Sequence, residues 1–221
     1  MTLAFADLVA QVQACRRCPA MEGRRRVLGA SNGPLDARIV LVGEAPGRLG
    51  ADRTGIPFSG DESGRRLDRL LAEAGWRRDE VFITNAVLCN PRRVDTARNR
   101  PPTSAELRAC QGHLAATLAF LRPRLVVALG RRALFALHAV EPHQLQHADP
   151  GMLTAWRHGY LTWMLHPSPL TQATRPWATQ CADWQRLRRV AEPMLSDLAP
   201  HAERRLSTAH FARSGFAAVL R

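Results

Sequence analysis

The sequence predicts an α/β protein, a three-layer α/β/α sandwich around a four-stranded parallel sheet. Two observations predict this fold class. Four short apolar runs, rich in β-branched residues, have the composition of buried strands. Segments with helical periodicity separate these runs along the chain, and strands that alternate with helices favour a parallel sheet with helices on both faces.

The first half of the chain contains two expected helices and two expected strands. Apolar residues recur at helical spacing in residues 3–14. The run at 39–42 is the first expected strand, and it ends in a glycine that begins a tight turn. A helix at about 62–74 follows, with its leucines on one face. The second strand is expected at 81–87, where a Cys-Asn-Pro sequence ends it.

The second half repeats the alternation of helix and strand. Thr103, followed three residues later by Glu106, forms a capping box that predicts the start of a helix. Residues 138–160 are the part of the chain whose structure the pattern predicts least clearly. The expected elements are a helix from Thr103 to about 121, a strand at 125–129, a short helix at 131–137, a strand at 161–165 and a last helix at about 177–195.

Length and composition predict one domain at 1–198 and a basic C-terminal extension at 199–221. The net charge of +12 and the pI near 11.3 favour a polyanionic partner, nucleic acid before membrane. All 31 basic residues are arginine, so Schiff-base catalysis would need the N-terminal amine. No secretory signal and no long apolar span is present, and we expect a cytoplasmic monomer that does not bind membranes.

The segment 43–64 joins the first strand to the following helix and is rich in glycine and proline. Open α/β proteins bind ligands at such positions, outside the carboxyl end of a strand. A plain surface loop is the alternative. A phosphate-binding loop fits poorly, because the segment has neither a Gly-Lys-Ser/Thr ending nor a G-x-G-x-x-G pattern.

Motifs in this segment resemble those of the uracil-DNA glycosylase superfamily. Residues 43–47 (GEAPG) and 55–58 (GIPF) resemble the first motif of family 4, whereas 53–55 (RTG) and 60–64 (GDESG) are closer to family 5. Residues 166–170 (HPSPL) resemble the second motif of the superfamily. The resemblance covers roughly residues 10–195. It implies a monofunctional DNA glycosylase that hydrolyses the N-glycosidic bond of uracil, and possible action on other deaminated bases, in base-excision repair.

The resemblance implies catalytic roles for three residues. Asp61 matches the family 5 catalytic aspartate, and Glu44 occupies the polar position of the family 4 motif. We favour Asp61 as the carboxylate that orients water, with Glu44 as the alternative. His166 would donate a hydrogen bond to O2 of the departing base. A structural histidine is the alternative interpretation.

Four further residues are implied to bind the base. Phe58 would stack on it, and the Asn85 amide would pair with its edge, donating to O4 and accepting from N3–H. A core phenylalanine and an asparagine satisfied by backbone are the alternatives. Gly43 begins the motif. Gly50 stands where family 4 has a bulky acidic residue, which predicts a roomier pocket that accepts uracil in mismatches and hypoxanthine.

The expected partner is uracil-containing DNA, single- or double-stranded. By the resemblance, Leu170 would fill the vacated position in the base stack, next to Ser168 of the same motif. Arg175 would contact phosphate, together with the arginines of 92–100 and of the C-terminal extension.

Five cysteines in a reducing compartment predict a metal site or reactive thiols rather than disulfides. The four candidate ligands are Cys15, Cys18, Cys89 and Cys110. Spacing alone leaves zinc, an iron–sulfur cluster and independent buried thiols open. The resemblance implies a [4Fe-4S] cluster, although the gap between the last two ligands is longer than usual because of an insertion at 92–99. Cys181 would be a core residue.

Two other function classes stay open. One is a member of the superfamily that binds nucleic acid without excising a base. The other is an iron–sulfur or zinc module that acts on proteins, which the net charge of +12 and the HPSPL motif disfavour.

Overall fold

The computed structural model describes residues 4–93, 95, 98–145 and 149–196. The predicted domain boundary after residue 198 and the predicted basic extension at 199–221 lie outside this part of the chain. Within it, no helix has both the length and the apolar character needed to cross a membrane.

The protein is an α/β sandwich with one central five-stranded sheet in the order β2-β1-β3-β5-β4. The strands are β1 (Ile39–Gly43), β2 (Val81–Asn85), β3 (Leu125–Leu129), β4 (Thr154–Trp156) and β5 (Gly159–Met164). The helices are α1 (Phe5–Gln13), α2 (Ala51–Thr54), α3 (Glu62–Glu73), α4 (Ser104–Leu121), α5 (Arg131–Val140) and α6 (Trp177–Ser196). The α/β class and the four predicted strands are confirmed.

The prediction of four strands was wrong by one strand. β4 pairs with β5 in antiparallel orientation at the edge of the sheet, whereas the other four strands are parallel. The tight turn between them contains Arg157 with a φ of 52°. Glycine or asparagine usually fills such a position, so an arginine there gives no turn signal in the sequence. β4 is also only three residues long.

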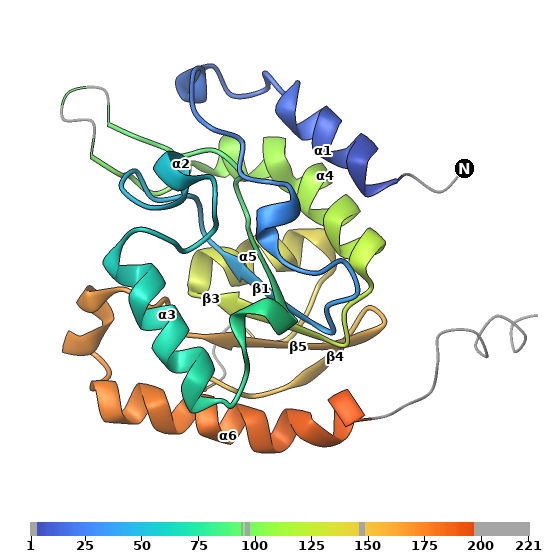
Figure 1. The fold of residues 1–221 in the computed structure, drawn as a ribbon, viewed down its shortest axis with the longest axis vertical. Coiled ribbons are helices and arrows are strands. Elements are labelled where there is room, and N and C mark those ends of the chain that lie inside the picture. Colours follow the sequence, from blue (N-terminus) through green and yellow to red (C-terminus); the bar gives the residue numbers. More distant parts are fainter. Residues whose placement is uncertain (1–3, 94, 96–97, 146–148, 197–221) are drawn as a thin grey trace, which may run out of the picture.

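Helices cover both faces of the sheet. α1, α4 and α5 pack on one face, and α3 and α6 pack on the other (Figure 1). β1 serves both cores by alternation, with Val40 and Val42 facing the first group of helices and Ile39 and Leu41 facing the second. All five residues of β1 are buried, as in a parallel strand covered on two sides.

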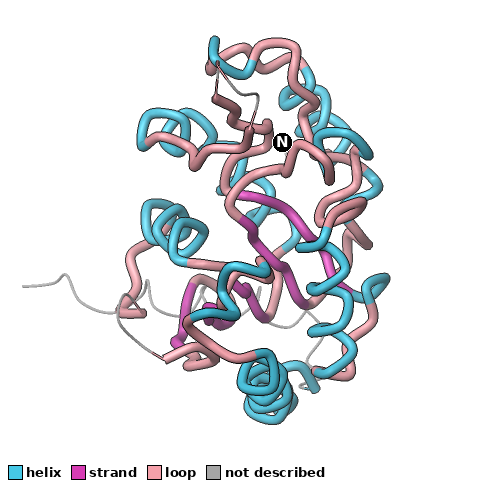
Figure 2. Tube along the Cα trace, turned by 90° about the vertical axis from the view of Figure 1, so that its left-hand side faces the viewer, coloured by secondary structure: helices cyan, strands magenta, loops and turns pink. Residues whose placement is uncertain are grey.

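The parallel strands deliver three loops to one edge of the sheet. β1 and β2 end side by side, because Gly43 pairs with Asn85, and β5 ends at Met164 on the far side of β3. Figure 2 shows the strands between the helical layers, with loops gathered beyond their ends. The loops after β1, β2 and β5 therefore meet where an open α/β sheet binds ligands.

Candidate active site

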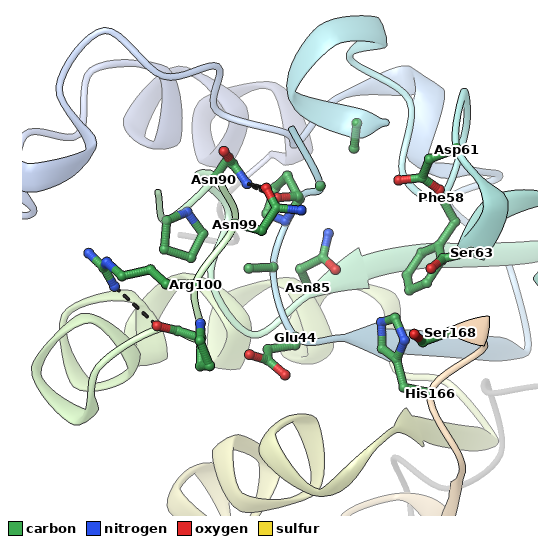
Figure 3. Close-up of a pocket in the computed structure, with 16 residues that line it drawn as sticks. Glu44, Phe58, Asp61, Ser63, Asn85, Asn90, Asn99, Arg100, His166 and Ser168 are labelled. Carbon is green, nitrogen blue, oxygen red and sulfur yellow. Dashed lines mark hydrogen bonds between the residues drawn. The ribbon is translucent and has the colours of Figure 1, made fainter. Parts of the chain in front are cut away.

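A cavity of about 340 Å³ lies at the carboxyl edge of the sheet. This volume is in the range of small-molecule sites. It is lined by Glu44, Ala45, Pro46, Gly47, Ala51, Phe58, Asp61, Ser63, Asn85, Asn90, Pro91, Asn99, Arg100, Pro101, His166 and Ser168. All three predicted catalytic residues are among them, as Figure 3 shows.

Asp61 is held at the start of α3 as its N-cap. Its Oδ1 accepts a hydrogen bond from the Gly64 N–H at 2.9 Å. Its Oδ2 lies against two glycines of the β1 loop. A β-carbon on Gly50 would overlap Oδ2 and lie 2.8 Å from Cγ, and one on Gly47 would lie 2.8 Å from Oδ2. The carboxylate fits there because neither residue has a side chain.

His166 follows β5 and faces Phe58, with ring centroids 5.6 Å apart. Burial lowers the pKa of His166 to about 4, while the nearby Asp61 carboxylate raises it slightly. The imidazole is therefore neutral near pH 7 and offers one N–H donor and one acceptor. His166 packs closely against Gly130, which has no side chain. A β-carbon at position 130 would lie 3.2 Å from the β-carbon of His166.

Phe58 and Asn85 meet over Gly43. A β-carbon on Gly43 would overlap Asn85 Oδ1 and would lie 2.6 Å from the Phe58 ring. Asn85 is 2% exposed, and its Oδ1 has no hydrogen-bond partner among the residues that the structure describes. A buried acceptor without a partner costs free energy that a bound donor would recover. Phe58 itself adopts a positive φ of 49°, which is rare for a bulky residue.

Glu44 projects into the same cavity from the other side (Figure 3). Its carboxylate lies 3.6 Å from the Arg132 guanidinium. Burial raises the pKa of Glu44, and Arg132 partly offsets that effect. The cavity therefore contains two carboxylates in different surroundings: one held by a helix N-terminus, the other facing an arginine.

Sequence reasoning missed two asparagines that line the cavity. Asn90 Nδ2 donates to the Pro46 carbonyl at 2.5 Å and to Asn99 Oδ1 at 3.0 Å. Asn99 Oδ1 also accepts from the Arg48 N–H at 3.0 Å, and its Nδ2 points toward the cavity (Figure 3). Asn90 belongs to the Cys-Asn-Pro sequence that ends the second predicted strand, and that position could have identified it. Nothing in the sequence indicates that Asn99 returns to the site.

The described residues at the two ends of the insertion at 92–99 pair with each other and wall the cavity, and we call this paired segment the hairpin. Arg92 and Asn99 form an antiparallel bridge, and the Arg93 N–H donates to the Arg98 carbonyl at 2.8 Å. Arg100 lines the cavity directly after the hairpin.

Two arginines of this hairpin region are engaged within the protein. Arg92 forms an ion pair with Asp52. Arg100 binds Glu106 through two hydrogen bonds of 2.6 and 2.8 Å, and this contact lowers the pKa of Glu106. Arg93 and Arg98 are exposed and remain better placed to meet a phosphate.

The loop after β5 carries the predicted DNA-contacting residues. Ser168 Oγ accepts from the Leu170 N–H at 3.2 Å and begins a short 3₁₀ helix, η4 (Pro169–Ala173). Leu170 is 85% exposed. Arg175 instead binds Asp183 through contacts of 2.5 and 2.7 Å, so it holds the loop to α6. Neither Leu170 nor Arg175 lines the cavity.

A second, smaller cavity lies among the four predicted ligand cysteines, Cys15, Cys18, Cys89 and Cys110. Burial raises the pKa of Cys89 to about 11 and that of Cys110 to about 12, and the neighbouring thiols add to both effects. No group of three or more His, Cys, Asp or Glu in the described parts of the chain is spaced for a single metal ion. Cys181 packs with the core under α3 and α6.

Comparison with known proteins follows the same division as the motifs. Residues 30–189 match the family model of the uracil DNA glycosylase superfamily. A type-4 uracil-DNA glycosylase of Thermotoga maritima is 43% identical over 124 residues, 56% of this chain and 60% of the relative. A type-4 enzyme of Archaeoglobus fulgidus is 40% identical over 128 residues, 58% of this chain and 60% of that one.

A type-5 uracil-DNA glycosylase of Thermus thermophilus is 36% identical over 184 residues, which are 68% of this chain and 81% of the relative. The chain thus spans 60% of the length of the two type-4 relatives and more of the type-5 relative.

Proposed function

Because the chain belongs to the uracil DNA glycosylase superfamily, we propose that it is a monofunctional glycosylase that hydrolyses the N-glycosidic bond of uracil in DNA, in base-excision repair. The observation that carries the proposal is the convergence of Phe58, Asp61, Asn85 and His166 on one cavity. A flipped nucleobase needs these groups: an apolar face, an edge-reading amide, a donor for its leaving charge and a carboxylate.

The proposed recognition step uses the partners that the cavity leaves open. The flipped uracil stacks on Phe58, whose ring is fixed between Gly43 and His166. Asn85 Oδ1, which has no partner in the described structure, accepts the N3–H of the base. The amide Nδ2 then donates to O4.

The proposed chemical step breaks the C1′–N1 bond and adds water at C1′. The electron pair of the broken bond moves to the base, and His166 donates a hydrogen bond to its O2 as charge develops. The neutral imidazole is suited to this role, because it keeps one N–H while avoiding a buried cation. Asp61 orients the water, stabilises the cationic sugar and accepts the proton that the water loses as its oxygen bonds to C1′; the released uracil anion then takes up a proton from solvent.

The surroundings of the two carboxylates favour Asp61 over Glu44 for this role. One oxygen of Asp61 is anchored by the helix N-terminus, and the other faces two glycines, so the group is oriented before substrate arrives. Glu44 has a raised pKa and faces Arg132. We assign Glu44 to a supporting position on the opposite wall of the cavity.

Gly50 faces the Asp61 carboxylate and not the cavity that the sequence predicted it to widen. The space that a side chain at 50 would occupy holds the Asp61 carboxylate, and Gly50 is not among the residues that line the cavity. A broad base range therefore remains a prediction. Parallel assays with uracil opposite guanine, opposite adenine and unpaired, and with hypoxanthine, test it.

The DNA partner would meet the face that carries Leu170 and the hairpin. Leu170 is the natural candidate to fill the vacated stack because of its exposure. Arg93 and Arg98 are the arginines of the hairpin that we assign to phosphate contacts. Arg175 would reach phosphate only by leaving Asp183.

We assign a [4Fe-4S] cluster to Cys15, Cys18, Cys89 and Cys110. The donor set fits, because four thiols from the segment after α1, the loop after β2 and α4 surround one cavity. Four thiolates suit zinc as well as a cluster, and the order of the four cysteines along the chain, which resembles that of the iron–sulfur families, is the reason for assigning a cluster. When bound, the group would join α1 to the sheet as a structural element. Iron content and visible absorbance, lost together in Cys110→Ser, test the assignment.

The test of function is excision from end-labelled DNA that carries one uracil, followed by alkaline cleavage and a denaturing gel. We expect cleavage at the uracil, with large losses in Asp61→Asn and His166→Gln and a smaller loss in Glu44→Gln. An uncut strand, from protein whose iron content is confirmed and which still binds the DNA, would instead support the binding-only alternative.

A further inference from the structure

Arg66 is a buried arginine outside the cavity. It lies on α3 and is only 7% exposed. Its Nη1 donates to Gln172 Oε1 at 3.2 Å, while Nε and Nη2 are buried without a hydrogen-bond partner in the described structure. Its guanidinium lies 4.4 Å from the centre of the Trp177 ring. A buried guanidinium is costly, so these few contacts are the ones that fix its position.

The two contacts of Arg66 reach the middle of one short segment and the residue that follows it. Gln172 lies in η4, two residues after the exposed Leu170, and Trp177 begins α6. We call residues 169–176 the wedge segment. Arg66 therefore touches the middle of the wedge segment and the residue that directly follows it.

Other side chains attach the wedge segment to its neighbours in the chain. Thr171 Oγ1 donates to the His166 carbonyl at 3.2 Å, at the end of β5. Two residues of α6 hold Arg175: Gln180 donates to its carbonyl at 2.7 Å, and Asp183 forms an ion pair with its guanidinium. Arg66 adds a link to α3, which packs beside α6 on the same face of the sheet and which Asp61 caps.

We propose that Arg66 is a positioning residue that holds the wedge segment, and with it Leu170, in register with Asp61. The inference deepens the proposed function and rests on it. An apolar side chain can fill a vacated stack only if its backbone is already ordered, because ordering it during insertion costs conformational entropy. A base that leaves a single strand opens no gap in a duplex for an apolar side chain to fill. Arg66 therefore matters more for duplex substrates than for single strands.

The first experiment compares excision rates on duplex and single-stranded uracil DNA for the full-length protein and two variants. Arg66→Met removes the guanidinium and keeps much of the apolar stem. Arg69→Met is the matched control, because the guanidinium of exposed Arg69 lies 4.7 Å from the centre of the same Trp177 ring. We expect Arg66→Met to lower the duplex rate at least fivefold more than the single-strand rate, and Arg69→Met to leave the ratio unchanged. Equal losses on both substrates would overturn the inference.

A second readout does not depend on excision. Hydrogen exchange of three amides of the segment reports its order directly, because Leu170 and Thr171 donate to Ser168 and Arg175 donates to Thr171. We expect at least fivefold faster exchange in Arg66→Met and no change in Arg69→Met; unchanged exchange in Arg66→Met refutes the link. If Arg66→Met fails to fold, Gln172→Leu at an exposed position makes the same test. A wild-type protein that excises nothing contradicts the proposed function, and exchange still decides the role of Arg66.

Discussion

At the scale of single residues, the Asp61 carboxylate packs directly against Gly50. The carboxylate occupies the volume that any β-carbon at 50 would need. We expect Gly50→Ala to lower the excision rate by about 10- to 100-fold, because displacement of a reacting group by about 1 Å costs that much. Measured rates in the Asp61→Ala background test the cause. There, Gly50→Ala should add no further loss, and two losses that multiply would show that Gly50 acts elsewhere.

The buried imidazole of His166 links stability to pH. Its folded pKa of about 4 is below the ordinary value of 6.5, so the unfolded chain binds this proton first as pH falls. The contribution to stability is complete above pH 6.5 and is lost as pH falls toward 4. Over this pH window, we expect the free energy of unfolding of His166→Gln to fall by about 1–3 kcal/mol less than that of the wild-type protein.

Urea denaturation at several pH values measures that difference. Burial also lowers the pKa of His113 and His143, so part of the dependence should persist in the variant. Identical curves for both proteins would mean that His166 titrates normally in the folded state.

Sequence reasoning found the site residues that stand beside a strand end or within a motif. Asp61, Asn85 and His166 belong to that group, and the structure brings them to one cavity. Asn99 was missed because its place depends on how an insertion folds back. The Asp183 partner of Arg175 is similarly invisible in the sequence, since an ion pair across eight positions leaves no periodic signal.

At the scale of elements, the insertion at 92–99 has a base that the rest of the protein holds in place, and we call the intervening residues 94–97 its tip. Its base is fixed by the Arg92–Asn99 bridge, the Arg92–Asp52 ion pair and the Asn90–Asn99 hydrogen bond. In the sequence, residues 92–99 could be recognised only as an insertion between Cys89 and Cys110. Their contacts make the insertion a wall of the cavity rather than an added loop.

We expect the tip to be dispensable for excision. Replacing residues 94–97 with Asn-Gly should preserve the bridge with a two-residue turn, and stability should change by less than about 1 kcal/mol. Asn99→Ala should lower the excision rate by about tenfold, the equivalent of one lost hydrogen bond. Rates and thermal melting of both variants provide the test. A large loss in the shortened variant would place function in the tip.

At the scale of the whole molecule, four parallel strands could be predicted because each is a continuous apolar run. β4 could not, since its residues are partly exposed and its turn uses Arg157. The same limit applies to charge. The net charge of +12 predicts an anionic partner, but it does not show which arginines are free to meet it.

We expect DNA affinity to fall steeply with salt. Neutralisation of about three duplex phosphates would weaken binding roughly 40-fold between about 50 and 200 mM salt. Arg93→Ala with Arg98→Ala should reduce the slope of log K against log salt by about 2. Arg92→Ala is the control: it should lower stability through loss of the Asp52 ion pair and keep the slope. Fluorescence anisotropy at several salt concentrations measures these slopes, and one slope for all variants would exclude the hairpin from the interface.

The contact between Gly50 and Asp61 also makes the two positions depend on each other. A side chain at 50 would take the space that this carboxylate now fills, so Asp61 could hold its present place only beside a glycine. We therefore expect a larger residue at 50 to be tolerated better when the residue at 61 is changed with it. The two positions behave as one coupled unit, although they lie eleven residues apart in the sequence.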